Sequence, residues 1–441
     1  MNKNKKYVWS NFCVKVPTYS SATIYKSTLT GAVVRISKEG ENNINSWLER
    51  RNDVMPSDIQ SLVDPNVGLL IQEGYNEYSS WRNRFIDKRN DGAHIFILHF
   101  LPTIQCQFRC NYCFENGGNR GMGMKAEIIQ KSRKWLYEYL VSHPEINKLR
   151  FVLFGGEPLL RKDIVTQGLH AFHSLAKEKG VEFWCELVSN GELLNETTAS
   201  ILSKYEWRRV QITLDGPKDV HNNRRYGHNK RPTFAKIIRN VQMLLSTNYI
   251  SKVDIRISFD FENADSIQRL IKYLAGFNKQ YRINLSLGLI TPTFQSQKKN
   301  ENEHLLASKV IATWKVAQEY GFKIPDEFIT GPWCIAIAKH SAILQPDGAL
   351  QKCLCTAGRK EYNFATIAET PKMYLKDARF EHFRRTNQCI EEKCSFLPMC
   401  GGGCIHDAIV EHCGPDGFNK RFCQKTLLAE YNKGLLNLKY S

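Results

Sequence analysis

HIFILHFLPTIQCQFRCNYCF, residues 94–114, joins an apolar run to three cysteines spaced C-x3-C-x2-C. The apolar run predicts a buried strand, and Cys106, Cys110 and Cys113 follow it directly. The next cysteine, Cys185, lies far along the chain. A structural zinc site normally closes with four ligands, so three thiols in isolation leave a ligand position for another group.

Further strand-like and helical segments alternate after this stretch. The apolar, β-branched runs are at 149–156, 181–191, 208–216, 253–260 and 283–292, and helical spacing is found at 128–143, 164–180, 234–245 and 266–277. Repeated strand and helix units predict parallel βαβ structure, which right-handed crossovers curl into a partial (β/α)6 TIM-like barrel. The predicted fold class is α/β, with the cysteines at the carboxyl ends of the strands, where catalytic residues of such barrels lie.

The two flanks of the barrel differ from it in pattern. Residues 1–93 predict a small α+β, winged-helix-like module, with strands around 23–40 and short helices before a returning strand near 70. Residues 326–441 are rich in cysteine, with Gly-Gly-Gly at 401–403, and predict loops held by metal clusters. We therefore expect three domains, 1–93, 94–325 and 326–441.

Composition narrows the class of protein. The chain has 441 residues, of which 42% are hydrophobic and 24% charged, with a mean hydropathy of −0.40. No apolar run approaches the ~18 residues of a membrane span, and no signal-peptide pattern follows the basic N-terminus, so a cytoplasmic protein is expected. In a reducing compartment, 14 cysteines indicate metal or redox sites rather than disulfides. Cys13 and Cys185, which stand alone, are expected to be small buried side chains.

The net charge of +17 and pI of about 9.2 first suggest nucleic acid as a partner. However, the basic residues are spread along the chain, and their densest group, residues 222–231, is short and loop-like. No nucleic-acid-binding motif accompanies it. An acidic peptide or a solvated basic face explains the charge equally well, so nucleic acid is disfavoured.

The cysteine loop resembles that of the radical S-adenosylmethionine (SAM) enzymes, in which C-x3-C-x2-C follows the first barrel strand and an aromatic residue, here Tyr112, precedes the last cysteine. The resemblance implies that Cys106, Cys110 and Cys113 hold a 4Fe–4S cluster whose fourth iron binds SAM. One electron then cleaves SAM to a 5′-deoxyadenosyl radical, which abstracts hydrogen from a substrate.

Other strand ends match the same family. Gly155-Gly156-Glu157-Pro158 resembles the GGEP motif, implying that backbone and carboxylate receive the methionine amino group, and Ser189-Asn190 occupies the ribose-contacting position. Arg256 is placed to meet the methionine carboxylate, although it could instead pair with Asp260. Thr213-Leu214-Asp215-Gly216-Pro217 resembles a motif that shapes the substrate channel.

The C-terminal cysteines resemble the SPASM extension, which implies two auxiliary 4Fe–4S clusters and three clusters in all; paired zinc ribbons are the alternative. One cluster would use Cys334, Cys353 and Cys404. The other would use the remaining set: Cys389, Cys394, Cys400 and Cys423. The fourth ligand of the first cluster is open at this stage, between His340, Cys355, Cys413 and an iron left free for substrate, and we expect a closed site.

The resemblance extends to the kind of reaction. SPASM enzymes modify peptides and proteins, and sulfatase-maturing members carry an Asp immediately after the cysteine that corresponds to Cys353, where this chain has Leu354. The favoured prediction is therefore a peptide maturase that crosslinks a ribosomally made precursor, whose leader the N-terminal module binds. A flavodoxin or ferredoxin is the expected electron donor. The alternatives are sulfatase-type protein oxidation, a small-molecule radical enzyme and a non-enzymatic iron–sulfur or nucleic-acid-binding protein.

Overall fold

A computed structural model describes residues 6–18, 22–50, 55–117, 121–247, 249–277, 282–290, 302–326, 334–371 and 385–440. The strands are β1 (Tyr7–Trp9), β2 (Cys13–Pro17), β3 (Ala22–Ser27), β4 (Val33–Ser37), β5 (Leu70–Gln72), β6 (Ile95–Phe100), β7 (Lys148–Leu153), β8 (Glu182–Ser189), β9 (Trp207–Leu214), β10 (Val253–Phe259), β11 (Ile283–Leu289), β12 (Ser341–Leu344), β13 (Ala349–Gln351) and β14 (Ala365–Thr366). The helices are α1 (Lys38–Arg50), α2 (Ser57–Gln60), α3 (Glu77–Asp91), α4 (Ala126–Ser142), α5 (Lys162–Lys179), α6 (Glu196–Leu202), α7 (Lys218–Arg224), α8 (Phe234–Ser246), α9 (Ile267–Ala275), α10 (Glu303–Glu319), α11 (Asn387–Glu391), α12 (Leu397–Cys400), α13 (Ile405–Glu411) and α14 (Lys425–Tyr440).

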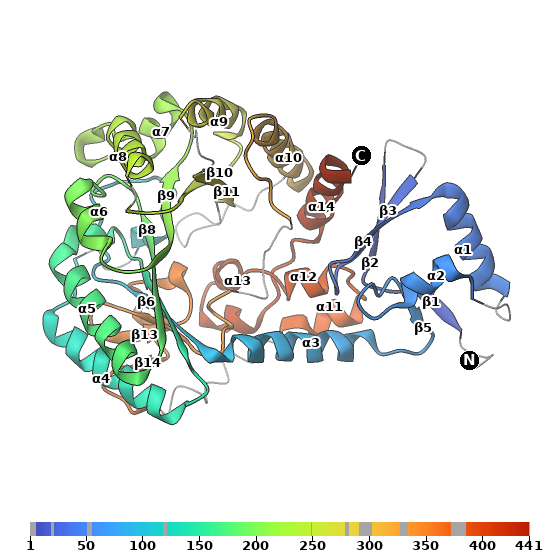
Figure 1. Cartoon of the computed structure of the whole chain (residues 1–441), viewed down its shortest axis with the longest axis horizontal. Helices are drawn as coiled ribbons and strands as arrows, with labels where there is room; N and C mark the ends of the chain where they lie inside the picture. Colours follow the sequence, from blue (N-terminus) through green and yellow to red (C-terminus); the bar gives the residue numbers. More distant parts are fainter. Residues whose placement is uncertain are drawn as a thin grey trace.

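Six parallel strands, β6 to β11, pair in chain order and curve into an open barrel with helices outside it (Figure 1). Alternation along each strand separates the two faces. On β6, Phe96 packs edge-on against Tyr139 of α4, and Phe100 against Phe172 of α5, while His99 points to the barrel interior. The predicted α/β class and partial (β/α)6 arrangement are confirmed. The predicted strand 283–292 corresponds to β11, and its last two residues lie outside the described part.

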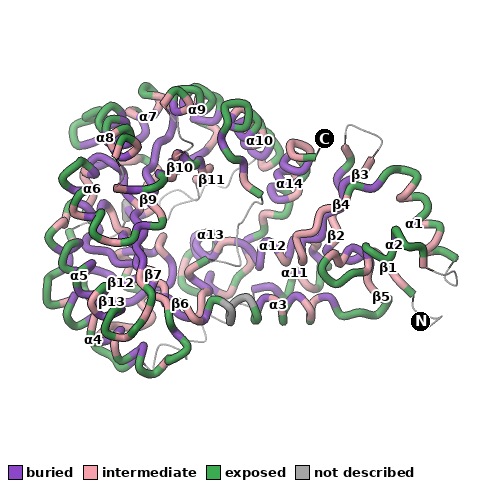
Figure 2. Tube along the Cα trace, in the orientation of Figure 1, coloured by how far each residue is buried: buried purple, intermediate pink, exposed green. Residues whose placement is uncertain are grey.

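The barrel sheet continues beyond its six strands. β12 pairs in parallel with β6, and the β13 and β14 strands follow in antiparallel pairing. The sheet therefore crosses the predicted boundary at 325/326, because part of the cysteine-rich segment adds strands to the barrel. Buried residues concentrate on these strands and on the inner helix faces (Figure 2).

The N-terminal residues form a three-stranded antiparallel sheet in the order β2-β3-β4, with a β1–β5 pair and α1 beside it. Helix α3 runs along one side of the molecule from this module to β6 (Figure 1). The module packs on the C-terminal segment: Phe12 and Trp81 share a buried cluster with Cys389 and Cys400. The Thr28 hydroxyl also donates to the Ser395 carbonyl. Within the described ranges, no helix combines the length and apolarity that a bilayer crossing demands.

Candidate functional site

A cavity of about 430 Å³ lies inside the barrel and extends to the loop after β6. All three cysteines of that loop, Cys106, Cys110 and Cys113, line it. The other predicted site residues on its wall are Tyr112, Gly155, Gly156, Ser189, Asn190 and Arg256. The structure therefore gathers, at one cavity, predicted site residues from four strands, β6, β7, β8 and β10, or from the loops that follow them.

Backbone hydrogen bonds hold the cysteine loop in place. The Ile104 N–H donates to the Met122 carbonyl at 3.1 Å, and the Arg109 N–H donates to the Tyr226 carbonyl at 2.8 Å. Within the loop, the Cys106 sulfur accepts from the Phe108 N–H at 3.4 Å. These hydrogen bonds position the three thiols at the cavity wall, although the loop that carries them is neither a regular helix nor a strand.

The glycine pair after β7 lets its backbone approach the cysteine loop closely. Gly155 has φ +135°, and a Cβ there would lie 2.3 Å from the Thr103 carbonyl oxygen. A Cβ on Gly156 would lie 2.3 Å from the Gln105 carbonyl oxygen. Any side chain would push the loop away, so these positions require glycine.

Glu157 is fully buried and is not part of the cavity wall. Its carboxylate accepts hydrogen bonds from the Leu159 N–H at 3.1 Å, from the Ser189 hydroxyl at 3.0 Å and from the Asn190 N–H at 2.8 Å. Burial raises the pKa of Glu157 to about 7, against the lowering effect of these donors. The carboxylate ties the end of β7 to the end of β8 instead of facing the cavity.

Asn190 links the hydrogen bonds of Glu157 to the cysteine loop. Its amide nitrogen lies 3.7 Å from the Cys106 sulfur, and its amide oxygen accepts from Gln107 at 3.3 Å. Gln107 also donates to Glu192, which forms an ion pair with Arg231. Gln107 and Glu192 do not line the cavity, but they fix the Asn190 side chain, a role that the spacing of motifs does not reveal.

Tyr112 leads to a buried charge network. Its hydroxyl accepts from Arg225 at 2.7 Å, and the Arg224 guanidinium lies 5.4 Å from its ring centroid. Arg224 pairs with Asp260 at 2.6 Å and lies 3.6 Å from Asp215. Asp215 is fully buried, burial raises its pKa, and it lies behind the cavity wall.

The position of Arg224 and Arg225 corrects the interpretation of residues 222–231 as a loop-like basic group. Both guanidinium groups are buried, at 5% and 8% exposure, and both serve the network around Tyr112. Arg225 lies on the cavity wall close enough to Cys110 to interact with it electrostatically. Its Nε has no partner among the described residues. An anionic cluster held by the three thiolates would supply the missing acceptor, so the residues present fit such a cluster.

Arg256 reaches the cavity from β10. Among the described residues it forms no ion pair with Asp260, whose carboxylate is taken by Arg224. Burial lowers the pKa of Arg256. Deeper in the cavity, Arg150 pairs with Glu186 at 2.8 Å. With Arg225 and Arg256 on the same wall, the cavity carries positive charge that suits a ligand carboxylate.

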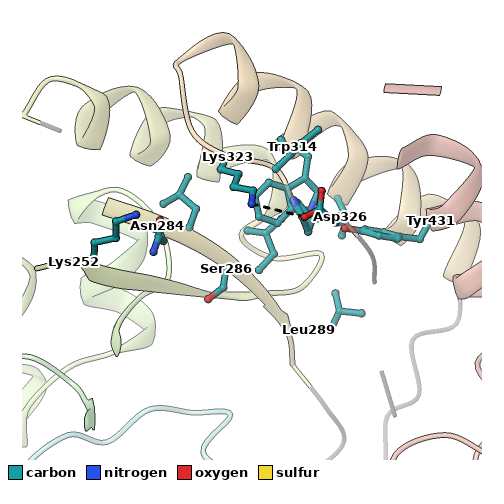
Figure 3. A pocket seen from close by; sticks show the side chains of 13 residues that line it. Lys252, Asn284, Ser286, Leu289, Trp314, Lys323, Asp326 and Tyr431 are labelled. Atoms are coloured by element: carbon teal, nitrogen blue, oxygen red, sulfur yellow. Dashed lines mark ion pairs between the residues drawn. The ribbon is translucent and has the colours of Figure 1, made fainter. Parts of the chain in front are cut away.

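A second cavity, of about 500 Å³, lies between β11, α10 and α14 (Figure 3). Trp314, Tyr431 and the Lys323–Asp326 ion pair line it. It contains none of the predicted site residues and no cysteine. We therefore assign the site to the barrel cavity.

The C-terminal cysteines separate into two groups by proximity. In the first, Cys353 and Cys355 form a thiol–thiol hydrogen bond, and both interact electrostatically with Cys404; Cys334 interacts with Cys353. In the second, Cys389 interacts with Cys394, Cys400 and Cys423. We call them the barrel-side cysteines (Cys334, Cys353, Cys355 and Cys404) and the module-side cysteines (Cys389, Cys394, Cys400 and Cys423).

Cys355 belongs to the barrel-side cysteines and also lines the cavity. It lies in the short 3-10 turn Leu354–Thr356, which packs against the turn Phe114–Gly117 that follows Cys113. No three of the His, Cys, Asp or Glu side chains in the described ranges converge tightly enough to hold a single metal ion. A cubane spreads its four ligands over four irons, so it needs a wider set of thiols.

His340 and Cys413 lie apart from that group. The His340 ring bonds to the Tyr139 hydroxyl at 2.7 Å and stacks edge-on against His143, on the helix-covered side of the sheet. Cys404 precedes α13 and Cys413 follows its end. At 1.5 Å per residue, the helix separates these two cysteines by roughly 13 Å. Of the three residues considered as fourth ligand, Cys355 is the one that the fold brings to Cys353.

Comparison with known protein families identifies the domain that holds the cavity. The sequence profile described as the radical SAM superfamily matches residues 100–274, which run from the last residue of β6 through the cysteine loop and β7 to β10. The chain contains a radical SAM domain. The predicted relationship is thereby confirmed, and with it the use of one 4Fe–4S cluster and SAM.

The chain resembles curated proteins over most of its length, among them these two. The radical SAM cyclopropyl synthase TigE of Paramaledivibacter caminithermalis is 23% identical, over 79% of this chain and 77% of its own. A cysteine-type anaerobic sulfatase-maturating enzyme of Clostridium perfringens is 20% identical, over 68% of this chain and 85% of its own.

Solved structures confirm the fold. One described as native anSMEcpe with bound AdoMet and Cp18Cys peptide superimposes with a TM-score of 0.58 at 17% identity, covering 78% of this chain and 95% of that one. Streptococcus suis SuiB bound to S-adenosylmethionine gives a TM-score of 0.54 at 14% identity, covering 97% and 100%.

Proposed function

We propose that this protein is a radical SAM peptide maturase that uses two auxiliary clusters besides the radical SAM cluster. One observation carries the proposal: Cys355, from the C-terminal segment, shares a cavity with Cys106, Cys110 and Cys113. A substrate in that cavity would lie between the radical-generating cysteines and a second redox site. Such an arrangement suits oxidative chemistry, because the carbon radical left by hydrogen abstraction must lose a further electron.

Bound together, the cluster at Cys106, Cys110 and Cys113 and SAM supply the 5′-deoxyadenosyl radical. The chain's own residues hold SAM. The Gly155–Gly156 backbone would receive the methionine amino group, because the Glu157 carboxylate already accepts hydrogen bonds from Leu159, Ser189 and Asn190. Arg256 would receive the methionine carboxylate, and the Ser189–Asn190 segment would contact the ribose. The predicted role of the GGEP motif therefore falls to its backbone, with Glu157 as the support.

We further propose that the N-terminal module binds the leader of a precursor peptide. Strand β4 is an edge strand of the β2-β3-β4 sheet, and an extended peptide can add to such an edge through backbone hydrogen bonds. A crystal structure of Streptococcus suis SuiB bound to precursor peptide SuiA covers 96% of this chain in superposition. This similarity supports a peptide as the substrate class. The bond installed, a thioether, carbon–carbon or ether crosslink, depends on the peptide.

Formylglycine formation, as in sulfatase maturation, is the second candidate, since sulfatase-maturating enzymes are among the similar proteins. In such enzymes an Asp follows the cysteine equivalent to Cys353. Here Leu354 occupies that place on the cavity wall. A leucine cannot accept a proton, so the position lacks the base that this reaction is expected to use.

The test uses anaerobically reconstituted protein, dithionite or a flavodoxin as reductant, and SAM. Candidate peptides encoded beside the gene are compared with a Cys- or Ser-containing sulfatase peptide. We expect 5′-deoxyadenosine to form with either kind of peptide. Only a peptide encoded beside the gene should lose two hydrogens. Formation of formylglycine in the sulfatase peptide, with the neighbouring peptides unchanged, would establish the second candidate instead.

A further inference from the structure

Arg385 is a buried residue between the barrel-side and the module-side cysteines. It is 2% exposed. Its guanidinium interacts electrostatically with Cys404 and Cys334 of the first group and with Cys400 and Cys389 of the second.

One edge of the guanidinium is anchored by the glycine turn 401–403. Nη2 donates to the carbonyl oxygens of Gly402 and Gly403. Gly402 has φ +88°, and a Cβ there would lie 3.1 Å from the Arg385 Nε. Glycine at this position therefore lets the backbone approach the Arg385 side chain closely. The two hydrogen bonds then fix the orientation of the guanidinium group.

The remaining donors are unsatisfied. Nε and Nη1 of Arg385 have no hydrogen-bond partner among the described residues, and no carboxylate there pairs with it. An arginine keeps its charge even when buried, and an unpaired buried charge is strongly destabilising. Among the described residues, the groups that interact with its charge are Cys404, Cys334, Cys400 and Cys389, which become thiolates once they carry metal.

We propose that Arg385 donates hydrogen bonds to sulfur atoms of both auxiliary clusters and sets their reduction potentials. The proposal rests on the proposed function, because it needs those clusters to be present. A cation and hydrogen-bond donors near cluster sulfurs stabilise the reduced form, which carries one more negative charge, and so raise the potential. Arg385 would thereby keep both auxiliary clusters able to accept an electron from the substrate side.

The experiment is an EPR-monitored redox titration of the reconstituted full chain. A background with Cys106, Cys110 and Cys113 replaced by Ala removes the radical SAM cluster signal. In this background, Arg385→Gln should lower the midpoint potential of both auxiliary clusters. At fixed ambient potential, the ratio of reduced to oxidised cluster should fall about tenfold, as for the loss of one charge-assisted hydrogen bond. Arg385→Lys, which keeps the charge but not the fork, should give a smaller shift.

Arg421→Gln is the matched control. Arg421 pairs with Glu392 at 2.6 Å and interacts with Cys389 and Cys423, which are module-side cysteines. Its replacement should move one cluster potential at most, whereas Arg385→Gln should move two.

Three outcomes would overturn the inference. Unchanged midpoints in Arg385→Gln with full iron content would show that the guanidinium does not act on the clusters. Loss of auxiliary iron in both Arg385→Gln and Arg385→Lys would make the residue a structural clamp on residues 401–403. Movement of one potential only would remove the bridging role. An unsubstituted protein with only about four irons per chain would instead contradict the proposed auxiliary clusters.

Discussion

The guanidinium of Arg256 lies directly over the Cα of Gly288 on the neighbouring strand, so that a Cβ at position 288 would lie 2.1 Å from the Arg256 Cζ. β10 and β11 pair in register here, with Ser258 opposite Gly288. The absence of a side chain at 288 is therefore what allows Arg256 to reach into the cavity.

Gly288→Ala should displace Arg256 and weaken SAM binding. We expect the KM for SAM to rise about tenfold or more, as for loss of one charge-assisted contact, with Arg256→Gln giving a similar change. SAM cleavage kinetics provide the measurement. Gly92→Ala, where a Cβ meets nothing within 4 Å, is the control. An unchanged KM in both the 288 and the 256 variants would remove Arg256 from the SAM site.

Replacing Cys106, Cys110 and Cys113 together with Ala should remove one cluster of three. The reconstituted protein should hold about twelve irons and twelve sulfides per chain, and the variant about eight of each. Production of 5′-deoxyadenosine should cease, because the cluster whose fourth iron binds SAM is absent from the variant. A colourless protein that binds two zinc ions would contradict the iron–sulfur interpretation of the C-terminal segment.

Cys355→Ala should change the barrel-side cluster, since Cys355 is the thiol that hydrogen-bonds to Cys353. We expect either a loss of iron approaching four atoms per chain or an altered EPR signal with iron retained. His340→Gln and Cys413→Ala should leave both iron content and signal as in the unsubstituted protein. A cluster change in either of those two variants, with Cys355→Ala unaffected, would reverse the assignment and reopen the possibility of substrate binding at a free iron.

Phe12→Ala should destabilise the packing between the N-terminal module and the module-side cysteines. Phe12 is fully buried against Cys389, Cys394 and Cys400, and a Phe to Ala change in a core costs about 3–5 kcal/mol. Iron should be lost to a chelator faster from the variant, while SAM cleavage persists.

Trp47→Ala is the matched control for Phe12→Ala, because Trp47 belongs to a cluster within the module that contains none of the module-side cysteines. Equal rates of iron loss in the two variants would contradict a specific role for the module in covering the cluster. The same contact means that deletion of residues 1–90 would expose the module-side cysteines, so point variants are the better test of leader binding.

Acidification should weaken the protein through His340. Burial lowers the pKa of His340 to about 4, so the folded state binds fewer protons than the unfolded state between that value and about 6.5. The stability contributed by the neutral ring is therefore complete above about 6.5 and is lost as the pH falls toward 4. Chemical unfolding from pH 7 to 5 should show a falling free energy of unfolding, and His340→Gln should reduce the slope. An identical slope in the variant would show that His340 titrates in the folded state as in the unfolded one.

Local pattern was sufficient for the barrel and for its cysteine loop. Alternating apolar strands and amphipathic helices admit one economical arrangement, a parallel sheet covered by helices, and the three cysteines follow β6 with a spacing that few metal sites share. The same holds for the recognition of Gly155 and Gly156, which belong to a contiguous Gly-Gly-Glu-Pro motif, whereas the reason that they must be glycine, the close approach of Thr103 and Gln105, is tertiary. In each case neighbouring residues along the chain carry the information.

The tertiary structure decided what depends on residues distant in sequence. From spacing alone, His340, Cys355 and Cys413 were equal candidates for the fourth cluster ligand. Spacing does not show which side of a sheet or which end of a helix faces Cys353. It also could not show that Glu157 is saturated by donors from β8, that Gly288 makes room for Arg256, or that Arg385 lies between two cysteine groups. Each of these relationships joins side chains whose separation is fixed by the packing of whole strands and helices. The spacing of residues along the sequence does not determine that distance.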